Sequence, residues 1–492
     1  MWVPEEGWAF ALRGDAGSGN SLLYFCDVAA GPGGFAEYVL WRRGPSAKGV
    51  GFTLKAKHDF TPDAFHIHAA PEAFHPYYGP DRDGDLYSTV NLRALRNLAQ
   101  RQTKGKWMHL VMGDGGFDVS GNENVQEILN KQLLLAQCIV AFATLRAGGA
   151  FVCKAFDLFT PFSASLVYLL HRCFDRICIY KPAQSRPANS ERYLLCHGYR
   201  RSEHTEVLVQ HLLGVNEQLN ALKPGWAKKR PGKDVASLVP LRVMQDSPFG
   251  AYLTDSNNRF IKAQRRALRQ LVGYMHDRSG RAADHAAVRT ECLKQWGLPE
   301  QASYGIPRRN AEDFFHYELQ QCETCKHREV VPKPLRAADA DLANPACRLR
   351  LWHDWVVFES SPAAPSLLIG VDGEARGTAF QHRQSDRGNT WACVDGLRLP
   401  HRTLILAEVC GETVYALDAA MLAGDNVRRL AYADRRRRLA LFIDAIEGDE
   451  MVLNAEARAR GDGAAARVRL RLLRALVQPH QGAAKRSGLG LA

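Results

Sequence analysis

The sequence contains no uninterrupted apolar run of about 18 residues, so no transmembrane helix is indicated. Its first residues carry acids at Glu5 and Glu6 and lack the basic-then-apolar order of a secretory signal peptide. Cys322 and Cys325 form a single C-x-x-C, with His327 nearby and Cys347 further on, but no second close pair that would complete a zinc site. We therefore expect neither a membrane-spanning segment nor a metal site.

The chain also lacks the cysteine pattern of a small secreted domain. Its 12 cysteines are spread over 492 residues and fall in apolar segments such as Val152-Cys153 and Leu195-Cys196. That distribution predicts buried, reduced thiols in the cytosol or nucleus. Lys and Arg together number 64 against 52 acids, a formal net charge of +12. A surplus of this size fits a polyanionic partner, usually a nucleic acid.

The most informative segment is Phe25–Phe35, FCDVAAGPGGF. An apolar run, Leu22–Val28, ends in a glycine-rich turn, and a helical pattern follows over Phe35–Trp41. Strand, tight turn and helix form the first unit of a doubly wound sheet, in which ligands bind at the carboxyl ends of the strands. The glycines allow close approach of a ligand, and Asp27 ends the strand. The pattern differs from the dinucleotide G-x-G-x-x-G and favours a methyltransferase, with a generic strand-to-helix turn as the alternative.

The first half alternates between strand and helix patterns, which predicts an α/β fold with a largely parallel sheet. The expected strands are Leu22–Val28, Val50–Leu54, Trp107–Met112, Ala150–Lys154, Arg176–Tyr180 and Arg192–Cys196. The expected helices, besides Phe35–Trp41, are Leu86–Gln100, Val125–Arg146 and Pro161–Cys173. The segment between the last two strands, Lys181–Glu191, has little helical character, so these strands should form an antiparallel hairpin.

Three polar residues stand at strand ends. Asp114 follows one apolar strand, Lys154 ends another, and Glu191 precedes a third. The carboxyl ends of parallel strands converge on one crevice, so Asp114 and Lys154 should face the pocket beside the glycine-rich turn. Glu191 joins them if its strand is antiparallel. The alternatives are that Asp114 is only a turn former and Lys154 only an exposed strand end.

The longer strings around these residues resemble a known family. FCDVAAGPGGFAEYVLWRR, MGDGGFDVSGNENVQEILNKQLLLAQ, FVCKAFDLFTPFSASLVYLL and SRPANSERYLLC are similar to segments of the FtsJ-type ribose 2′-O-methyltransferases, and closely resemble the eukaryotic cap-specific mRNA 2′-O-methyltransferases. The close resemblance covers residues 21–199 and becomes weaker in the C-terminal half. It implies a Rossmann-like fold that uses S-adenosyl-L-methionine.

The resemblance also implies roles for individual residues. Asp114, Lys154 and Glu191 match catalytic positions. The cofactor positions are Asp27, Ala29, Ala30, Gly31, Pro32, Gly33, Gly34, Phe35 and Asp85. The positions that contact the capped RNA end are Asn124, Val125, Gln126 and Asn189. In the family a lysine, here Lys154, holds or removes the proton of the ribose hydroxyl during methyl transfer.

One family feature has no counterpart. The family's first catalytic lysine lies on a helix well upstream of the glycine-rich turn. Here the first lysine is Lys48, between the first predicted helix and the second strand, and Arg13 is the only basic residue before Arg42. An arginine stays protonated and is a poor base. We expect the missing lysine to belong to a longer version of this protein, with an impaired domain as the alternative.

The second half is expected to hold three further parts. The segment Lys223–Asp234 has the composition of a linker, and Phe260–Gly273 and His285–Trp296 are predicted helices. From about Leu349, short apolar runs predict an antiparallel sheet. Within it, GVDGEARG resembles the K-x-D-G-x-R motif of guanylyltransferases, but Gly370 replaces the nucleophilic lysine, so no covalent nucleotide intermediate is possible. The alternative is an ordinary hairpin turn at Asp372-Gly373.

Taken together, these patterns predict four parts. They are an FtsJ-type domain over 1–222, a linker and helical connector over 223–335, an α+β degenerate guanylyltransferase-like domain over 336–475 and a flexible tail over 476–492. Arg435–Arg438 is expected to be a solvated helix face, with phosphate contact as the alternative.

The predicted function is methylation of the first-nucleotide ribose of capped mRNA. A ribosomal or transfer RNA ribose methyltransferase and a non-catalytic cap- or RNA-binding protein remain alternatives. The resemblance also implies a nuclear location and partners in the capped mRNA 5′ end and the transcription machinery.

Overall fold

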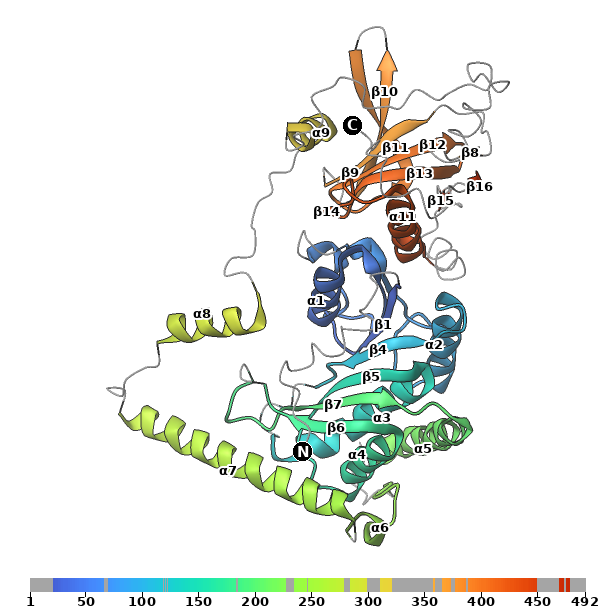
Figure 1. Ribbon diagram of the computed structural model, residues 1–492. Helices are drawn as coiled ribbons and strands as arrows, with labels where there is room; N and C mark the ends of the chain where they lie inside the picture. Colours follow the sequence, from blue (N-terminus) through green and yellow to red (C-terminus); the bar gives the residue numbers. More distant parts are fainter. Residues whose placement is uncertain are drawn as a thin grey trace.

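The computed structural model consists of two β-sheet domains connected by helices (Figure 1). The structure describes residues 21–65, 70–117, 119, 121, 123–182, 185–226, 234–245, 247–277, 284–298, 310–320, 357–358, 365–372, 377–385, 388–448, 469–472 and 475–477. Residues 223–226, 317–320, 357–358, 384–385, 388–389, 469, 472 and 475–477 are described in their backbone only.

The first domain is built on a seven-stranded sheet with the order β3-β2-β1-β4-β5-β7-β6. All its neighbouring strands run parallel except β7, which pairs antiparallel with both β5 and β6. The strands are β1 (Leu23–Val28), β2 (Ala47–Phe52), β3 (Phe74–Pro76), β4 (Met108–Gly113), β5 (Leu145–Ala155), β6 (Phe174–Tyr180) and β7 (Arg192–Tyr199). The predicted α/β sheet and its terminal antiparallel hairpin are therefore confirmed.

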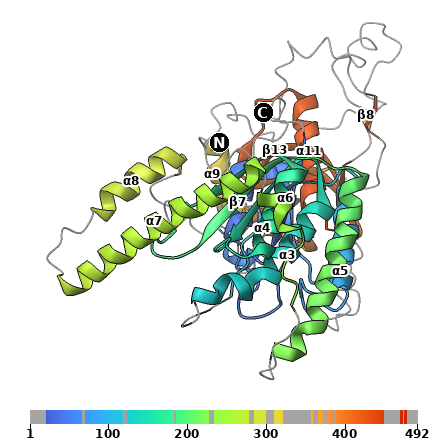
Figure 2. The same ribbon diagram turned by 90° about the horizontal axis from the view of Figure 1, so that it is seen from below.

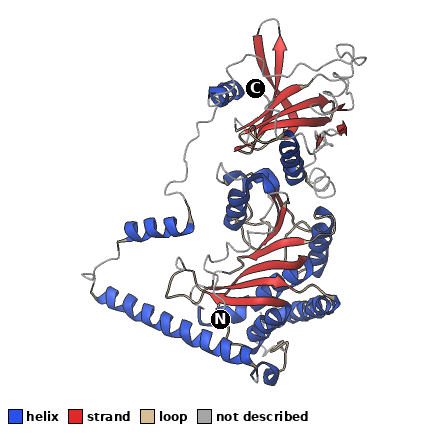
Figure 3. Ribbon diagram, in the orientation of Figure 1, coloured by secondary structure: helices blue, strands red, loops and turns tan. Residues whose placement is uncertain are grey.

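Helices cover both faces of this sheet (Figure 3). Helix α1 lies on one face and α2, α3 and α4 lie on the other (Figure 1), where α3 contacts both α2 and α4. Their bounds are α1 (Gly34–Arg43), α2 (Thr89–Gln102), α3 (Gln126–Thr144) and α4 (Pro161–Cys173). Ser88 caps α2 and Thr160 caps α4, each accepting a hydrogen bond from a first-turn N–H.

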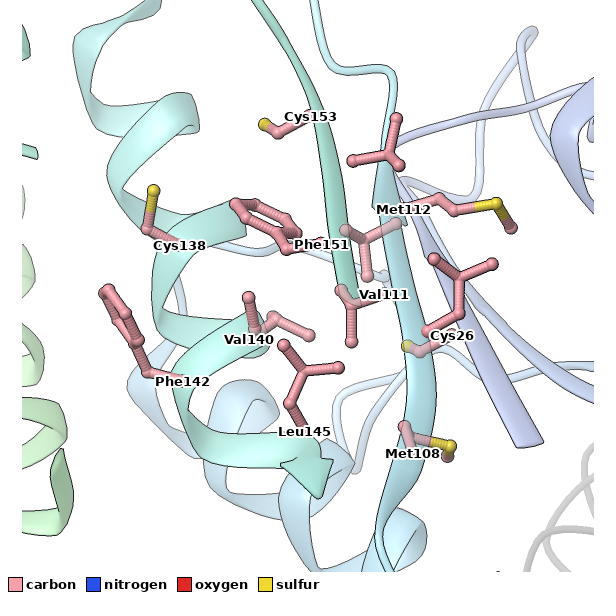
Figure 4. Packing of buried hydrophobic residues seen from close by; sticks show 14 of the residues in the cluster. Cys26, Met108, Val111, Met112, Cys138, Val140, Phe142, Leu145, Phe151 and Cys153 are labelled. Carbon is pink, nitrogen blue, oxygen red and sulfur yellow. The ribbon is translucent and has the colours of Figure 1, made fainter. Parts of the chain in front are cut away.

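The centre of the first domain is a continuous apolar core. Figure 4 shows Phe151 of β5, Val111 of β4 and Cys138 of α3 packed together. Cys26, Cys138, Cys153 and Cys196 are buried free thiols, as the cysteine distribution predicts. This core fixes the parallel strands rigidly, so the residues that follow their carboxyl ends are held in defined positions.

Further helices extend from the first domain. Helix α5 (Glu203–Trp226) packs on α3 and α2, and the short α6 (Leu241–Gln245) leads into the long α7 (Pro248–His276), which runs along the edge of the domain (Figure 2). Helix α8 (His285–Trp296) follows, and Arg42 of α1 donates a hydrogen bond to the carbonyl oxygen of Trp296. In the described part of the chain no helix is long and apolar enough to cross a membrane.

The second domain holds a seven-stranded sheet with the order β11-β10-β9-β12-β13-β14, to which β15 adds by pairing with β13. The pairs are antiparallel except β13–β15, so the predicted antiparallel sheet is essentially confirmed. Its elements are α9 (Ala311–Gln320), β9 (Ser366–Val371), β10 (Thr378–Ser385), β11 (Gly388–Arg398), β12 (Thr403–Cys410), β13 (Thr413–Leu422), β14 (Asp425–Asn426), α11 (Tyr432–Ile446) and β15 (Arg469–Leu472). A separate two-stranded sheet pairs β8 (Val357–Phe358) with β16 (Ala475–Val477).

Helix α11 lies between the two domains (Figure 1). Leu439, Phe442 and Ile443 belong to the core of the second domain, whereas Ala445 belongs to the core of the first. The side chain of Lys48 on β2 donates hydrogen bonds to the carbonyl oxygens of Asp444, at 2.8 Å, and Glu447, at 2.5 Å. Lys48 therefore satisfies carbonyl groups at the C-terminal end of α11.

Two predictions about the second half need correction. The predicted linker beginning at Lys223 overlaps α5, whose helical backbone continues to Trp226. The solvated face predicted for Arg435–Arg438 is wrong for its first two members, because Arg435 and Arg436 are buried. Arg435 makes two hydrogen bonds to the carboxylate of Asp418, at 2.9 and 2.7 Å, which compensates the buried charge.

Candidate active site

The glycine-rich turn between β1 and α1 is closely packed on one side and open on the other. A side chain at Gly31 would place its first carbon 2.0 Å from the carbonyl oxygen of His58. Gly33 has a φ of +111° and lies against the ring of Phe65. A first side-chain carbon at Gly34, by contrast, would meet nothing within 4 Å. Only glycine suits the first two positions, and the third leaves free space beside the backbone.

Asp27 is the last residue but one of β1, just before this turn, and it is fully buried. Its Oδ2 accepts a hydrogen bond of 3.1 Å from the N–H of Ala36 in the first turn of α1. Its Oδ1 is buried and has no hydrogen-bond partner among the described residues. Burial raises the pKa of the Asp27 carboxyl well above its usual range, and the charge of Asp114 raises it further. A cationic or hydrogen-donating ligand at the turn would compensate this group.

Asp114 and Lys154 meet at the carboxyl ends of β4 and β5. Lys154 Nζ lies 3.2 Å from Asp114 Oδ1, and the lysine side chain is only 14% exposed. The hydroxyl of Tyr193 on β7 donates a 2.8 Å hydrogen bond to the same oxygen. Burial and the negative charge of Asp114 both raise the pKa of Tyr193, so it remains a hydrogen-bond donor. The predicted convergence of Asp114 and Lys154 is therefore present in the structure.

Glu191 lies at the same edge because β7 is antiparallel to β5. The register pairs Arg192 with Ala155 and Tyr193 with Lys154, which puts Glu191 just beyond the end of β5. Its Oε1 accepts a 2.7 Å hydrogen bond from the hydroxyl of Ser185. Within the described residues Glu191 makes no hydrogen bond to Lys154 or Asp114. It therefore lies at the same edge of the sheet as the pair but does not contact it through a hydrogen bond.

The remaining predicted residues border the same edge. Asp85 accepts a 2.8 Å hydrogen bond from the N–H of Tyr87 through one carboxylate oxygen. Asn124 and Val125 form a short 3₁₀ turn, Glu123–Val125, directly before α3. Gln126 begins α3, and its side-chain oxygen lies 3.2 Å from the hydroxyl of Ser190, beside Asn189. The two predicted RNA-contacting segments are thereby joined.

A shallow pocket that is open to solvent adjoins Lys154 on the side of α3. Its polar lining includes Glu127, Asn130, Lys131 and Asp157. Asp157 pairs with the buried Arg192 at 2.5 Å. Burial raises the pKa of Asp157, while the charge of Arg192 lowers it. The pocket therefore combines charged groups with hydrogen-bonding amides next to the Asp114–Lys154 pair.

The sequence-based prediction of this site missed several contributing residues. Tyr193 carries the hydrogen bond to Asp114, and Lys181 binds the loop that bears Asn189 and Glu191. Tyr193 lies near the start of β7, two residues after Glu191, so alternation places the two on the same side, but its contact with Asp114 follows only from the register of β5 against β7. Lys181 offers no such signal, since it lies in an irregular segment.

The second domain has no amine at the position of the guanylyltransferase nucleophile. A first side-chain carbon at Gly370 of β9 would lie 2.4 Å from the carbonyl oxygen of Pro400. The strand therefore packs too closely for any side chain there. Cys322 and Cys325 lie outside the described residues, and the described residues hold no group of three or more side chains suited to a metal ion.

Comparison with known proteins agrees with this geometry. The sequence profile described as FtsJ-like methyltransferase matches residues 11–199. Residues 11–199 are therefore similar in sequence to FtsJ-like methyltransferases. The resemblance stated from the sequence strings and the Rossmann-like methyltransferase fold are thereby confirmed. The guanylyltransferase-like character of the second domain and the domain boundaries stay predictions.

The chain is also similar to proteins named cap-specific mRNA (nucleoside-2'-O-)-methyltransferase 1. It is 38% identical to the Bos taurus and the Homo sapiens proteins over 442 residues, covering 86% of this chain and 50% of each relative. The Caenorhabditis elegans protein is 36% identical over 460 residues, which cover 87% of this chain and 48% of that one. The chain thus spans about half the length of the curated relatives it matches.

Proposed function

We propose that this chain transfers a methyl group from S-adenosyl-L-methionine to the ribose 2′-hydroxyl of the first transcribed nucleotide of capped mRNA. The observation that carries the proposal is the Asp114–Lys154 pair next to an open glycine-rich turn. The named activity of the relatives supports the choice of substrate. A nuclear site of action beside the transcription machinery is part of the same proposal.

The residues at the turn fit the proposed cofactor. Asp27 offers a buried carboxylate oxygen without a partner, and Gly34 leaves open space beside the backbone. The positive charge of S-adenosyl-L-methionine would offset the two nearby carboxylates of Asp27 and Asp114. When bound, the cofactor supplies an electrophilic methyl group. Asp85 and the residues from Ala29 to Phe35 would hold it.

The side chains of the site would prepare the ribose hydroxyl. A hydroxyl is a weak nucleophile until its proton is held or removed. Lys154 is placed to do this, because Asp114 fixes its Nζ and Tyr193 in turn fixes the Asp114 carboxylate. Asn124, Val125, Gln126 and Asn189 would hold the capped RNA end against the pair. Most of the rate gain would then come from alignment of the reacting atoms.

A single assay tests the proposal. Label from S-adenosyl-L-methionine is followed into short RNA that carries an N7-methylguanosine cap, with uncapped RNA of the same sequence alongside. We expect label on the first-nucleotide ribose, reduced at least about a hundredfold by Lys154→Ala. The matched control is Lys106→Ala, an exposed lysine at the opposite edge of the sheet, which should retain full activity.

The other outcomes distinguish the alternatives. Equal labelling of capped and uncapped RNA would indicate a ribosomal or transfer RNA ribose methyltransferase. Binding of both S-adenosyl-L-methionine and capped RNA without transfer would indicate a non-catalytic binding protein. Either result would overturn the proposed reaction.

A further inference from the structure

The loop of residues 185–191 carries two of the predicted site residues, Asn189 and Glu191, yet it has little regular structure. Its hydrogen bonds converge on one side chain, that of Lys181, which directly follows β6. Lys181 Nζ donates to Asn189 Oδ1 at 2.8 Å, to the carbonyl oxygen of Asn189 at 3.1 Å and to that of Glu191 at 2.6 Å. It also donates to Ser185 Oγ at 3.2 Å. A single ammonium group therefore binds both ends of the loop.

The acceptors of Lys181 are themselves linked. Ser185 Oγ donates to the Glu191 carboxylate at 2.7 Å, and Asn189 Oδ1 accepts from the N–H of Glu191 at 3.2 Å. The position of the Glu191 carboxylate thus depends on two residues that Lys181 holds. The hydrogen bonds from the Lys181 ammonium group and the one to the Glu191 carboxylate are charge-assisted. Such hydrogen bonds are about twice as strong as neutral ones.

The outer side of the loop is supported separately. Gln264 of α7 donates a 3.1 Å hydrogen bond to the carbonyl oxygen of Ala188. The buried Arg192, at the start of β7, binds Asn257 of α7 at 3.1 Å and stacks over the ring of Phe260. These contacts would keep the loop near α7 without Lys181, but they do not reach the Glu191 carboxylate. The direction of the Glu191 carboxylate is therefore set by the hydrogen bonds that Lys181 and Ser185 make within the loop.

We propose that Lys181 is a positioning residue that orders the 185–191 loop and aims Asn189 and Glu191 at the Asp114–Lys154 pair. This inference rests on the proposed function only where it concerns methyl transfer. The effect of Lys181 on the order of the loop does not depend on any activity. Lys181 does not exchange protons with the substrate, because its hydrogen atoms are committed to the loop.

The first test measures the loop directly, by hydrogen–deuterium exchange of the full chain. In Lys181→Met we expect exchange of the 185–192 segment to be roughly tenfold faster, with β1 and β4 unchanged. Ser185→Ala, a smaller change, should speed exchange less. Lys106→Met serves as the control and should leave the segment unchanged. Unaltered protection of the segment in Lys181→Met would overturn the proposal, whether or not the chain transfers methyl groups.

The second test uses methyl transfer to short capped RNA. Loss of alignment predicts a fall of about 10- to 100-fold in kcat for Lys181→Met, with the affinity for S-adenosyl-L-methionine unchanged. If Lys181 acts through Glu191, Lys181→Met should cost much less in a Glu191→Gln background than in the wild type. Full additivity of the two changes would contradict the positioning role.

Discussion

At the scale of single residues, the site depends on groups that are unfavourable in isolation. Asp27 is a fully buried carboxyl with an oxygen that lacks a partner among the described residues, and it lies near a second carboxylate, Asp114. Burying such a group costs stability unless a ligand compensates it. Natural proteins keep buried polar groups that lack a partner mainly at functional sites.

Asp27→Asn should therefore stabilise the unliganded protein at neutral pH. The folded state raises the pKa of Asp27, so it keeps the proton to a higher pH than the unfolded chain, in which Asp titrates near 3.9. Stability is consequently lost as pH rises through the folded pKa. We expect the variant to raise the free energy of unfolding at pH 7 by about 1 kcal/mol and to make little difference near pH 4. Denaturant titrations at the two pH values measure this.

The matched control for that titration is Asp81→Asn, an exposed carboxyl, which should change stability by less than about 0.5 kcal/mol at either pH. Asp27→Asn should also weaken binding of S-adenosyl-L-methionine, since the compensating charge is lost. A destabilised variant at pH 7 would show that the Asp27 carboxylate is satisfied in the fold.

The sequence could predict Asp114 and Lys154 because each follows an apolar strand, and parallel strands converge at their carboxyl ends. It could not predict the hydrogen bond from Tyr193 without the register of β5 against β7. The role of Lys181 could not be predicted, because an irregular loop that folds around one ammonium group has no periodic pattern in the sequence. Nor could it foresee the burial of Arg435, because that depends on the distant Asp418.

At the scale of elements, the contact between β2 and α11 links the two domains through the hydrogen bonds of Lys48. Lys48→Met should remove two hydrogen bonds to the C-terminal carbonyl groups of α11 while preserving much of the buried apolar stem. We expect the second domain to lose about 1–3 kcal/mol of stability, because charged hydrogen bonds to a helix end are broken in a buried position. Thermal unfolding followed by calorimetry measures the change.

Lys104→Met provides the comparison for Lys48→Met. Lys104 also reaches α11, through a 3.5 Å ion pair with Asp444, but its side chain is 71% exposed. Exposed ion pairs contribute little, so its loss should cost less than about 0.5 kcal/mol. Equal effects of the two substitutions would mean that burial of Lys48 does not matter.

Helices with a clear periodic pattern of apolar residues were predicted closely. Strands whose bounds depend on pairing with neighbouring strands were not. Helices α4 and α8 have the predicted bounds. Strand β5 begins at Leu145 rather than Ala150, because Leu145 pairs with Met108 of β4 beyond the irregular point in the register. Strand β10 lacks a distinct apolar run, and its place follows from its pairing with β9 and β11.

At the scale of the whole molecule, α11 makes the two sheets part of one packed structure. Residues of α11 enter both apolar cores, and the contacts of α11 with the first domain include β2, the strand that leads from Lys48 to the region beside the glycine-rich turn. The carbonyl oxygen of Phe52, at the end of β2, accepts a hydrogen bond from the N–H of Ala29 in that turn. Ligand binding at the turn and docking of the second domain therefore act on the same strand.

This arrangement predicts that a ligand at the turn stabilises both domains together. S-adenosyl-L-homocysteine at about 100 times its dissociation constant should add about 2.7 kcal/mol to the stability of the wild type, in a single shifted unfolding transition. In Lys48→Met, where docking is weakened, two transitions should separate, and the ligand should shift only the one that belongs to the first domain. Calorimetry with and without the ligand distinguishes these patterns. Two independent transitions in the wild type would show that α11 joins the domains without coupling them.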